Sequence, residues 1–386
     1  MNIALDVGTH EFRSLRIANG KLIARRCRAA YAVVDDTVNH RTMLKQASVS
    51  YAVGEEQLLI YGDDAERVSQ LFRIPCLELL PGGDVPADDP PARQMIAALI
   101  ESLIGRVPGR MRRGEPKQAR AEGNGAICAL TLPHLEGVGC PEFNFPRMTL
   151  EQPSNFGGKL NSGHPTPTEW TSRHREFISR LPRLHGYVPL ELSAPQALVL
   201  AELESRAFTG IGLVFGAGST QAGLIHRGNV VAHCSVPYAG HWIDLRLARA
   251  QQVYFWDARG NKYLDVDKTR AWKESFDGSL REPVSSRDQQ LADLHRGMVE
   301  FTLREAAATF APEIKRLGMI ESLPLVVAGG TARIPGFRDL LLDVLPAVSL
   351  PVDLRDVRLA IDDYTIARGG LIRAELEAGE SGGVAA

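Results

Sequence analysis

The sequence predicts an α/β protein with two similar domains around a central cleft. Three observations support this prediction: the chain has 386 residues, strand and helix patterns alternate along it, and one strand-turn-strand unit occurs twice. At about 150 residues per domain, such a length allows two or three domains. We expect the first domain to span residues 1–190 and the second to span residues 191–386, with a small subdomain at about 245–287.

Strand patterns dominate the N-terminal segment. Apolar runs at Asn2–Asp6, Arg13–Ile17 and Leu22–Ala29 predict three strands, and Asn19-Gly20 predicts the hairpin turn that joins the last two. Alternating residues over 47–62 predict further strand. Helical spacing of apolar residues predicts helices over Asp63–Leu71, Ala92–Ile104, Thr171–Leu181 and Pro195–Arg206.

The composition changes between about residues 105 and 170, where we expect a long irregular insertion. Basic residues gather near its start, and an apolar strand at Cys128–Leu132 interrupts it. Pro, Gly, Asn and Ser then fill residues 137–167. Because no aromatic residues alternate with the basic ones, the pattern favours a solvated loop over a nucleic-acid site.

Composition excludes several classes of protein. The formal net charge is −2, so no overall attraction to nucleic acid or an anionic membrane follows. No stretch is long and apolar enough to span a membrane, and the start lacks the basic segment of a secretory signal. The five cysteines are scattered without a Cys-x-x-Cys pair, which is typical of reduced thiols. We therefore expect a cytoplasmic protein.

The repeated unit consists of a strand, a turn with Gly and a hydroxyl residue, and a second strand. Its copies begin at Ala4–Thr9 and Val214–Ser219, an alignment that matches Asp6 with Gly216. Such turns allow backbone N–H groups to approach an anion, and the hydroxyl adds a donor. Two of these turns from facing domains predict a polyphosphate site between them.

A third element lies at Leu325–Gly336. It contains a buried strand, the pair Gly329-Gly330 and a segment that starts a helix. The glycines allow a flat group to lie against the backbone, and Arg333 has a guanidinium that can stack on such a group.

Together the three elements resemble the phosphate-1, phosphate-2 and adenosine motifs of the actin, heat shock protein 70 (DnaK-type) and sugar kinase ATPase superfamily. Gly329–Pro335 resembles the DnaK-type sequence Gly-Gly-Ser-Thr-Arg-Ile-Pro most. Tyr61–Ala65, Ala239–Asp244 and Asp363–Gly369 are similar to further DnaK-type segments in the same order. The resemblance covers residues from about 2 to 374. It implies a two-domain actin-like ATPase fold, with duplicated ribonuclease H-like domains around a nucleotide cleft.

The resemblance also implies ATP and Mg²⁺ as cofactors and gives roles to residues of this chain. For His10 two interpretations stay open, a cationic phosphate donor or a turn side chain facing solvent, and we favour the second. The implied residues are Asp6 for catalysis and metal; Gly8, Thr9, His10, Gly218, Ser219 and Thr220 for the phosphates; and Lys273, Gly329, Gly330, Arg333 and Asp363 for adenosine.

Two expected carboxylates are missing. The second phosphate motif of the superfamily begins with Asp, where our alignment has Gly216, and the helix before it begins Glu-Pro, where this chain has Ala194-Pro195. Glu191 lies three residues upstream of Ala194. Nucleotide binding is spread over many backbone donors, whereas phosphoryl transfer depends on positioned groups. We therefore expect binding with weak or absent hydrolysis.

Four functions remain open at this point. The first is an ATP-binding switch similar to a DnaK-type ATPase domain, without a substrate-binding domain. The second is a filament-forming bacterial actin-like protein of the MreB or ParM type, and the third is a scaffold that no longer binds nucleotide. A sugar kinase would need a catalytic Asp in the cleft, and the sequence identifies none. The expected partners are a nucleotide and either further copies of this chain or another protein.

Overall fold

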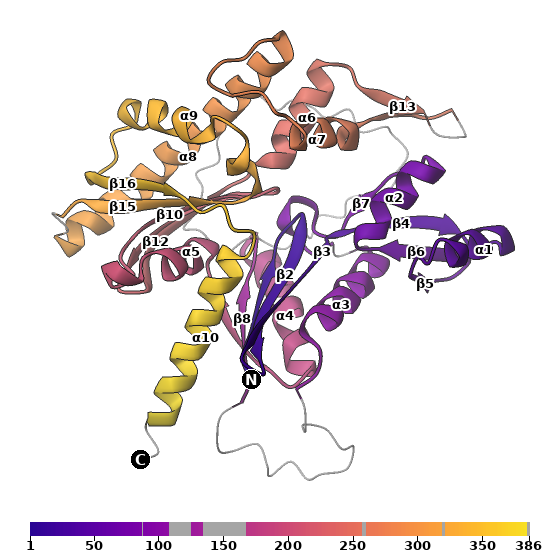
Figure 1. Ribbon diagram of the computed structural model, residues 1–386, viewed down its shortest axis with the longest axis horizontal. Helices are drawn as coiled ribbons and strands as arrows, with labels where there is room; N and C mark the ends of the chain where they lie inside the picture. Colours follow the sequence, from indigo (N-terminus) through magenta and orange to yellow (C-terminus); the bar gives the residue numbers. More distant parts are fainter. Residues whose placement is uncertain (87, 108–124, 134–166, 257–259, 319–320, 384–386) are drawn as a thin grey trace.

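The computed structural model describes residues 1–86, 88–107, 125–133, 167–256, 260–318 and 321–383, and two large sheets dominate it (Figure 1). Most of the insertion predicted at about 105–170 lies outside these described residues.

The first large sheet has five strands. The first three strands of the chain form an antiparallel meander, and the other two pair parallel to the first strand and to each other. Asn19 and Gly20, with φ of 52° and 71°, make the predicted hairpin turn. In sheet order the strands are β3 (Lys21–Arg28), β2 (Glu11–Ala18), β1 (Ile3–Val7), β8 (Ile127–Thr131) and β9 (Val188–Leu192).

The second large sheet repeats the order and the directions of the first. Again an antiparallel meander is followed by two parallel strands. The predicted internal duplication is therefore confirmed. In sheet order the strands are β12 (Asn229–Val236), β11 (Thr220–His226), β10 (Gly210–Phe215), β15 (Leu323–Ala328) and β16 (Leu354–Leu359).

Two helices are exchanged between the sheets. Helix α5 (Ala194–Glu202) follows β9 of the first sheet but packs on β10 and β11 of the second. Helix α10 (Thr365–Gly383) follows β16 of the second sheet but packs on β1 and β8 of the first. The two helices also cross, and a Cβ on Gly369 of α10 would lie 1.7 Å from the carbonyl oxygen of Ala197 in α5. Glycine is thus required for this approach of the two backbones.

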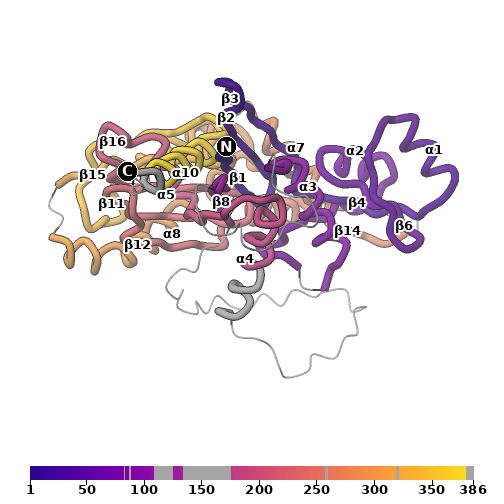
Figure 2. The backbone as a smooth tube through the Cα atoms, turned by 90° about the horizontal axis from the view of Figure 1, so that it is seen from below, coloured from indigo at the N-terminus to yellow at the C-terminus, as the bar shows by residue number. Residues whose placement is uncertain are grey.

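A smaller sheet extends the N-terminal half and lies at one end of the molecule (Figure 2). The sequence predicted strand and helix here but no separate sheet. Its strand order is β5-β6-β4-β7. Its elements are β4 (Ala30–Asp35), α1 (Val38–Gln46), β5 (Tyr51–Val53), β6 (Gln57–Tyr61), α2 (Asp63–Phe72) and β7 (Leu77–Glu78).

A second peripheral unit extends the C-terminal half, near the top of Figure 1. It contains a two-stranded ribbon and two helices, and it includes most of the small subdomain predicted at about 245–287. The boundaries of that subdomain and the domain limits of 1–190 and 191–386 stay predictions. The elements are α6 (Gly240–Ala250), β13 (Tyr254–Trp256), β14 (Lys262–Leu264) and α7 (Val266–Glu274).

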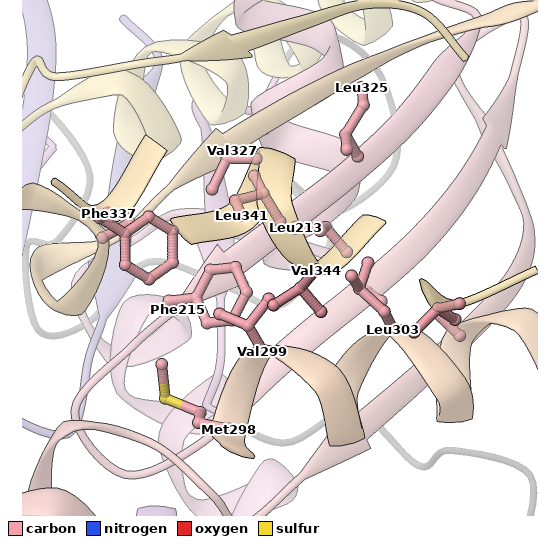
Figure 3. Close-up of a cluster of buried hydrophobic side chains, with 14 of the residues drawn as sticks. Leu213, Phe215, Met298, Val299, Leu303, Leu325, Val327, Phe337, Leu341 and Val344 are labelled. Carbon is pink, nitrogen blue, oxygen red and sulfur yellow. The ribbon is translucent and has the colours of Figure 1, made fainter. Parts of the chain in front are cut away.

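Each large sheet packs against α5 or α10 on one face, and further helices cover the other face. Helices α3 (Pro90–Ile104) and α4 (Pro167–Leu184) cover the first sheet. Helices α8 (Ser286–Leu317) and α9 (Phe337–Val344) cover the second, and Figure 3 shows Phe215, Met298 and Phe337 packed in that core. Short 3-10 turns complete the chain at Pro81–Gly83, Glu204–Arg206, Gly330–Arg333 and Leu345–Ala347. Within the described residues, no helix has both the length and the apolar character needed to cross a membrane.

We predict that Gly369→Ala destabilises the protein by about 1–3 kcal/mol, because its methyl group collides with the Ala197 carbonyl at the helix crossing. Gly379→Ala is the matched control on the same helix, since a Cβ there meets nothing within 4 Å. That control should stabilise by about 0.5–1 kcal/mol. Urea denaturation measures both variants. Equal stability of the two would mean that the crossing tolerates a side chain.

Candidate functional site

A cleft of about 450 Å³ lies between the two large sheets, a volume in the range of small-molecule sites. It brings together ten predicted residues from segments far apart in the sequence. Gly218 and Thr220 do not line it directly, although they belong to the same turn as Ser219. The ten lining residues are Asp6, Gly8, Thr9, His10, Ser219, Lys273, Gly329, Gly330, Arg333 and Asp363.

The two Gly turns have the same hydrogen-bonded geometry. The N–H of Gly8 donates to the carbonyl of Glu11 at 3.1 Å, and the N–H of Gly216 donates to the carbonyl of Ser219 at 3.1 Å. A Cβ on either glycine would lie 2.7 Å from that carbonyl oxygen. Gly8 and Gly216 are therefore structural counterparts.

This equivalence corrects the sequence alignment of the two copies. Asp6 precedes its glycine by two residues and is the last residue of β1 to pair with β8. Val214 stands in the same place in β10 relative to β15, so Val214 and not Gly216 is the counterpart of Asp6. The error arose because the alignment matched Thr9 with Ser219. A shift of two residues keeps the alternation of a strand in phase, so the hydrophobic pattern did not reveal it.

The two turns meet inside the cleft, as predicted. A Cβ on Gly218 would lie 2.6 Å from Oγ1 of Thr9, so a glycine is needed where the halves touch. The Ser219 hydroxyl donates to the Pro133 carbonyl at 2.9 Å, which ties the second turn to the segment after β8. Thr220 faces elsewhere, because its hydroxyl donates to the Tyr238 carbonyl at 2.7 Å.

Asp6 sits at the floor of the cleft beside a cation that the sequence analysis missed. Its Oδ1 accepts a hydrogen bond from the Thr131 hydroxyl at 2.6 Å, and its Oδ2 lies 3.7 Å from Arg13. Burial raises the pKa of Asp6, and the positive charge of Arg13 opposes that rise. Arg13 also donates to Glu11 at 2.6 Å and lines the cleft. The available signal was the register of the predicted hairpin, in which Arg13 on β2 pairs opposite Asp6 on β1.

His10 fits neither interpretation made from the sequence. Arg28 donates to its Nδ1 at 2.8 Å, so the ring proton is on Nε2, which lies 3.6 Å from Glu274. Burial and the neighbouring cations, Arg28 first, lower the pKa of His10 to about 2. The ring is therefore neutral, and its side chain is 25% exposed where it lines the cleft. Arg28 and Glu274 of α7 cover the rest of the ring, so it is not the solvent-facing turn side chain that we favoured.

A polar bridge connects the two peripheral units across the cleft. Nδ1 of His241 on α6 lies 3.0 Å from Glu78 on β7, and Arg270 on α7 lies 3.8 Å from the same carboxylate. Burial would raise the pKa of Glu78, but the hydrogen bond with His241 and the charge of Arg270 hold it below its usual value. The bridge therefore links the N-terminal and C-terminal peripheral units directly.

The predicted adenosine wall begins with a strained glycine. Gly329 has a φ of 108°, and a Cβ there would lie 2.1 Å from the Phe215 carbonyl oxygen, whereas a Cβ on Gly330 meets nothing within 4 Å. Arg333 is ion-paired with Asp363. Burial would raise the pKa of Asp363, but the bond and charge of Arg333 keep it below its usual value. Stacking of Arg333 on a base stays a prediction.

Lys273, which the resemblance also assigns to adenosine, lies near Thr331 of that wall: a Cβ on Gly240 would meet the side chains of both residues. Its Nζ lies 2.7 Å from Asp244, which is fully buried, and donates to the Gly240 carbonyl at 3.0 Å. Arg270 lies 3.7 Å from the same Asp244. The buried carboxylate is thus compensated by two cations, and it positions Lys273 at the edge of the cleft.

The position at which the superfamily has the Glu of its Glu-Pro pair also belongs to the cleft. Ala194 lies at the start of α5 and lines the site. Glu191 cannot replace the missing carboxylate in this arrangement, because Arg175 and the Ser179 hydroxyl of α4 bind both of its oxygens.

The cleft offers a metal little direct coordination. The parts of the chain that the structure describes contain no group of three or more His, Cys, Asp or Glu side chains arranged to hold a metal ion. Mg²⁺ bound with a nucleotide needs fewer, since phosphate oxygens and waters complete its shell around one or two carboxylates. Asp6 fits that role as a single carboxylate.

Comparison with solved structures shows the same two-domain architecture in bacterial actin-like proteins. MreB 5 of Spiroplasma citri bound to AMPPNP is 14% identical with a TM-score of 0.59, covering 100% of this chain and 98% of that chain. The same protein bound to ADP is 14% identical with a TM-score of 0.58, covering 98% of this chain and 97% of that chain. A MamK double helical filament is 16% identical with a TM-score of 0.56, covering 97% of this chain and 99% of that chain. At these identities the likeness shows the fold, and it does not support a particular closeness to the DnaK-type domain.

Sequence comparison identifies the family. A search of curated proteins finds no match. The model of the Volactin family, in contrast, matches residues 1–120 and 148–374, which is most of the chain. The chain therefore belongs to the Volactin family and has the two-domain actin-like ATPase fold.

Proposed function

We propose that this protein binds ATP with Mg²⁺ in its cleft and, in that state, assembles into actin-like filaments. The observation that supports the proposal most is the meeting of the two Gly turns, where Gly218 lies against Thr9. There, backbone N–H groups of both duplicated halves can face one polyphosphate. A ligand that contacts both halves favours their closed arrangement by its differential affinity.

The structural relatives support both parts of this proposal. MreB 5 binds AMPPNP and ADP, and MamK forms a double helical filament. A chain with the same architecture is expected to use nucleotide in the same way. These relatives favour filament formation over the ATP-binding switch of DnaK type that the sequence first indicated.

Hydrolysis is expected to be slow. When bound, Mg²⁺ would offset the charge of the phosphates, and Asp6 would hold it through its water shell. Val214, which is 9% exposed, and Ala194, which is 7% exposed, present apolar surface where the superfamily has carboxylates. The attacking water then lacks an acceptor that orients it. The loss of such a positioned group lowers the rate of hydrolysis by about 10²–10⁴-fold. Binding is unaffected, because the backbone donors remain.

The first prediction concerns ATP binding and assembly. The protein should bind ATP in calorimetry and pellet on ultracentrifugation with ATP and Mg²⁺ but not without nucleotide. Gly330→Val should weaken ATP binding by about tenfold or more and abolish pelleting, because its side chain would enter the open cleft. Gly379→Val, far from the cleft on α10, should bind ATP as the natural protein does.

Two results separate the alternatives. ATP binding without pelleting at any concentration would favour the non-polymerising switch. Absence of ATP binding would leave the scaffold as the remaining function and overturn the proposal.

The second prediction concerns hydrolysis. Val214→Asp combined with Ala194→Glu should raise phosphate release by about 10²-fold, with much smaller effects of each change alone, since the groups act together. Gly216→Asp is the control, because its Cβ would press on the Ser219 carbonyl at 2.7 Å. It should lower stability without raising turnover. Fast hydrolysis by the natural protein would show that the apolar positions do not limit the reaction.

A further inference from the structure

His295 is a buried side chain of the cleft that the proposed function has not used. It lies on α8, is 1% exposed and lines the cleft together with Phe276 and the Gly329–Pro335 segment. Its ring makes an edge contact with Phe337, with 6.3 Å between the ring centroids. The ring therefore has a fixed orientation at the wall where the sequence predicts adenosine.

The hydrogen bonds of His295 fix its tautomer. Nδ1 lies 2.8 Å from the Leu291 carbonyl, which can only accept, so Nδ1 carries the proton. Nε2 is then a lone-pair acceptor, and none of the described residues donates to it. Burial and the nearby charge of Lys273 lower the pKa of His295 to about 3, so the ring stays neutral.

The other polar groups around the wall are already engaged. Lys273 is held by Asp244 and the Gly240 carbonyl, and Arg333 is held by Asp363. Both cations are therefore held in place, although each keeps N–H donors beyond those that its partners accept. Among the described residues at this wall, Nε2 of His295 is an acceptor without a donor, and its natural complement is a ligand N–H donor.

We infer that His295 is a specificity-determining residue that accepts a hydrogen bond from the 6-amino group of a purine. The inference rests on the proposed function and makes the cleft selective for adenine nucleotides over 6-oxo purines. Adenine presents N6–H donors at this position, whereas guanine presents the acceptor O6. An O6 atom would face the Nε2 lone pair, and changing the tautomer would leave the Leu291 carbonyl without its donor.

The probe pair for this inference is ATP and inosine triphosphate, whose base carries a 6-oxo group in place of the amino group. Calorimetry on the natural protein should show ATP binding about tenfold or more tighter than inosine triphosphate. His295→Phe keeps a flat ring without the acceptor. In that variant ATP should weaken to the affinity of inosine triphosphate, while inosine triphosphate binding stays unchanged or improves.

Thr302→Val is the matched control. Thr302 is also buried on α8 and donates to the carbonyl four residues earlier, that of Met298, at 2.8 Å, but it does not line the cleft. Its loss should leave the preference for ATP intact. A thermal melt of each variant confirms folding, and the ratio measured on the natural protein tests the inference even where a variant fails to fold.

The pH profile provides a further readout. Because His295 stays neutral down to about pH 3, the preference should be constant between pH 5 and pH 8, whereas a solvated histidine would lose its acceptor below about pH 6.5. Equal binding of the two nucleotides would overturn this inference alone. Failure of both to bind would overturn the proposed function and the inference with it.

Discussion

The crossing of α5 and α10 is the contact on which the arrangement of the two halves depends. Each helix follows one sheet and packs on the other, and Gly369 and Ala197 bring their backbones together. Pro195 at the start of α5 also packs closely on β10, where a Cβ on Gly212 would lie 2.6 Å from its carbonyl oxygen. These close backbone contacts leave no room for a side chain, so they fix how the two sheets face each other. The ends of β1 and β10 therefore point toward one place, and the cleft forms there.

The chemistry of the cleft follows from what the duplication kept and what it lost. Both copies keep the glycine whose N–H closes the turn, so both present backbone donors. The first copy keeps Asp6, while the second has Val214 in its place. Backbone donors that can bind an anion are therefore present in both halves. Of the catalytic carboxylates expected in the cleft, only Asp6 is present. Under the proposed function, a bound nucleotide would then link the two halves for a long time.

The sequence predicted the α/β class and the duplication, because glycine turns and strand periodicity leave local signals. The resemblance to the ATPase superfamily implied the ten residues that line the cleft. The sequence did not predict the correct alignment of the two copies. Thr9 was matched with Ser219, and this two-residue shift left the hydrophobic pattern of the strands unchanged. Helix α8 was not predicted either, although Ser285 and Asp288 form a capping box at its start. The roles of His10 and His295 depend on Arg28 and Lys273, which lie on other elements, and such contacts appear only when separate segments meet.

The proposed function requires one nucleotide to occupy the cleft between the duplicated halves. Hydrogen–deuterium exchange with and without ATP tests it most directly, because it locates binding along the chain. The account predicts simultaneous protection of the turns at residues 8–11 and 216–219 and of the segment at residues 329–335. Protection confined to one half, or unchanged exchange in all three segments under saturating ATP, would contradict it.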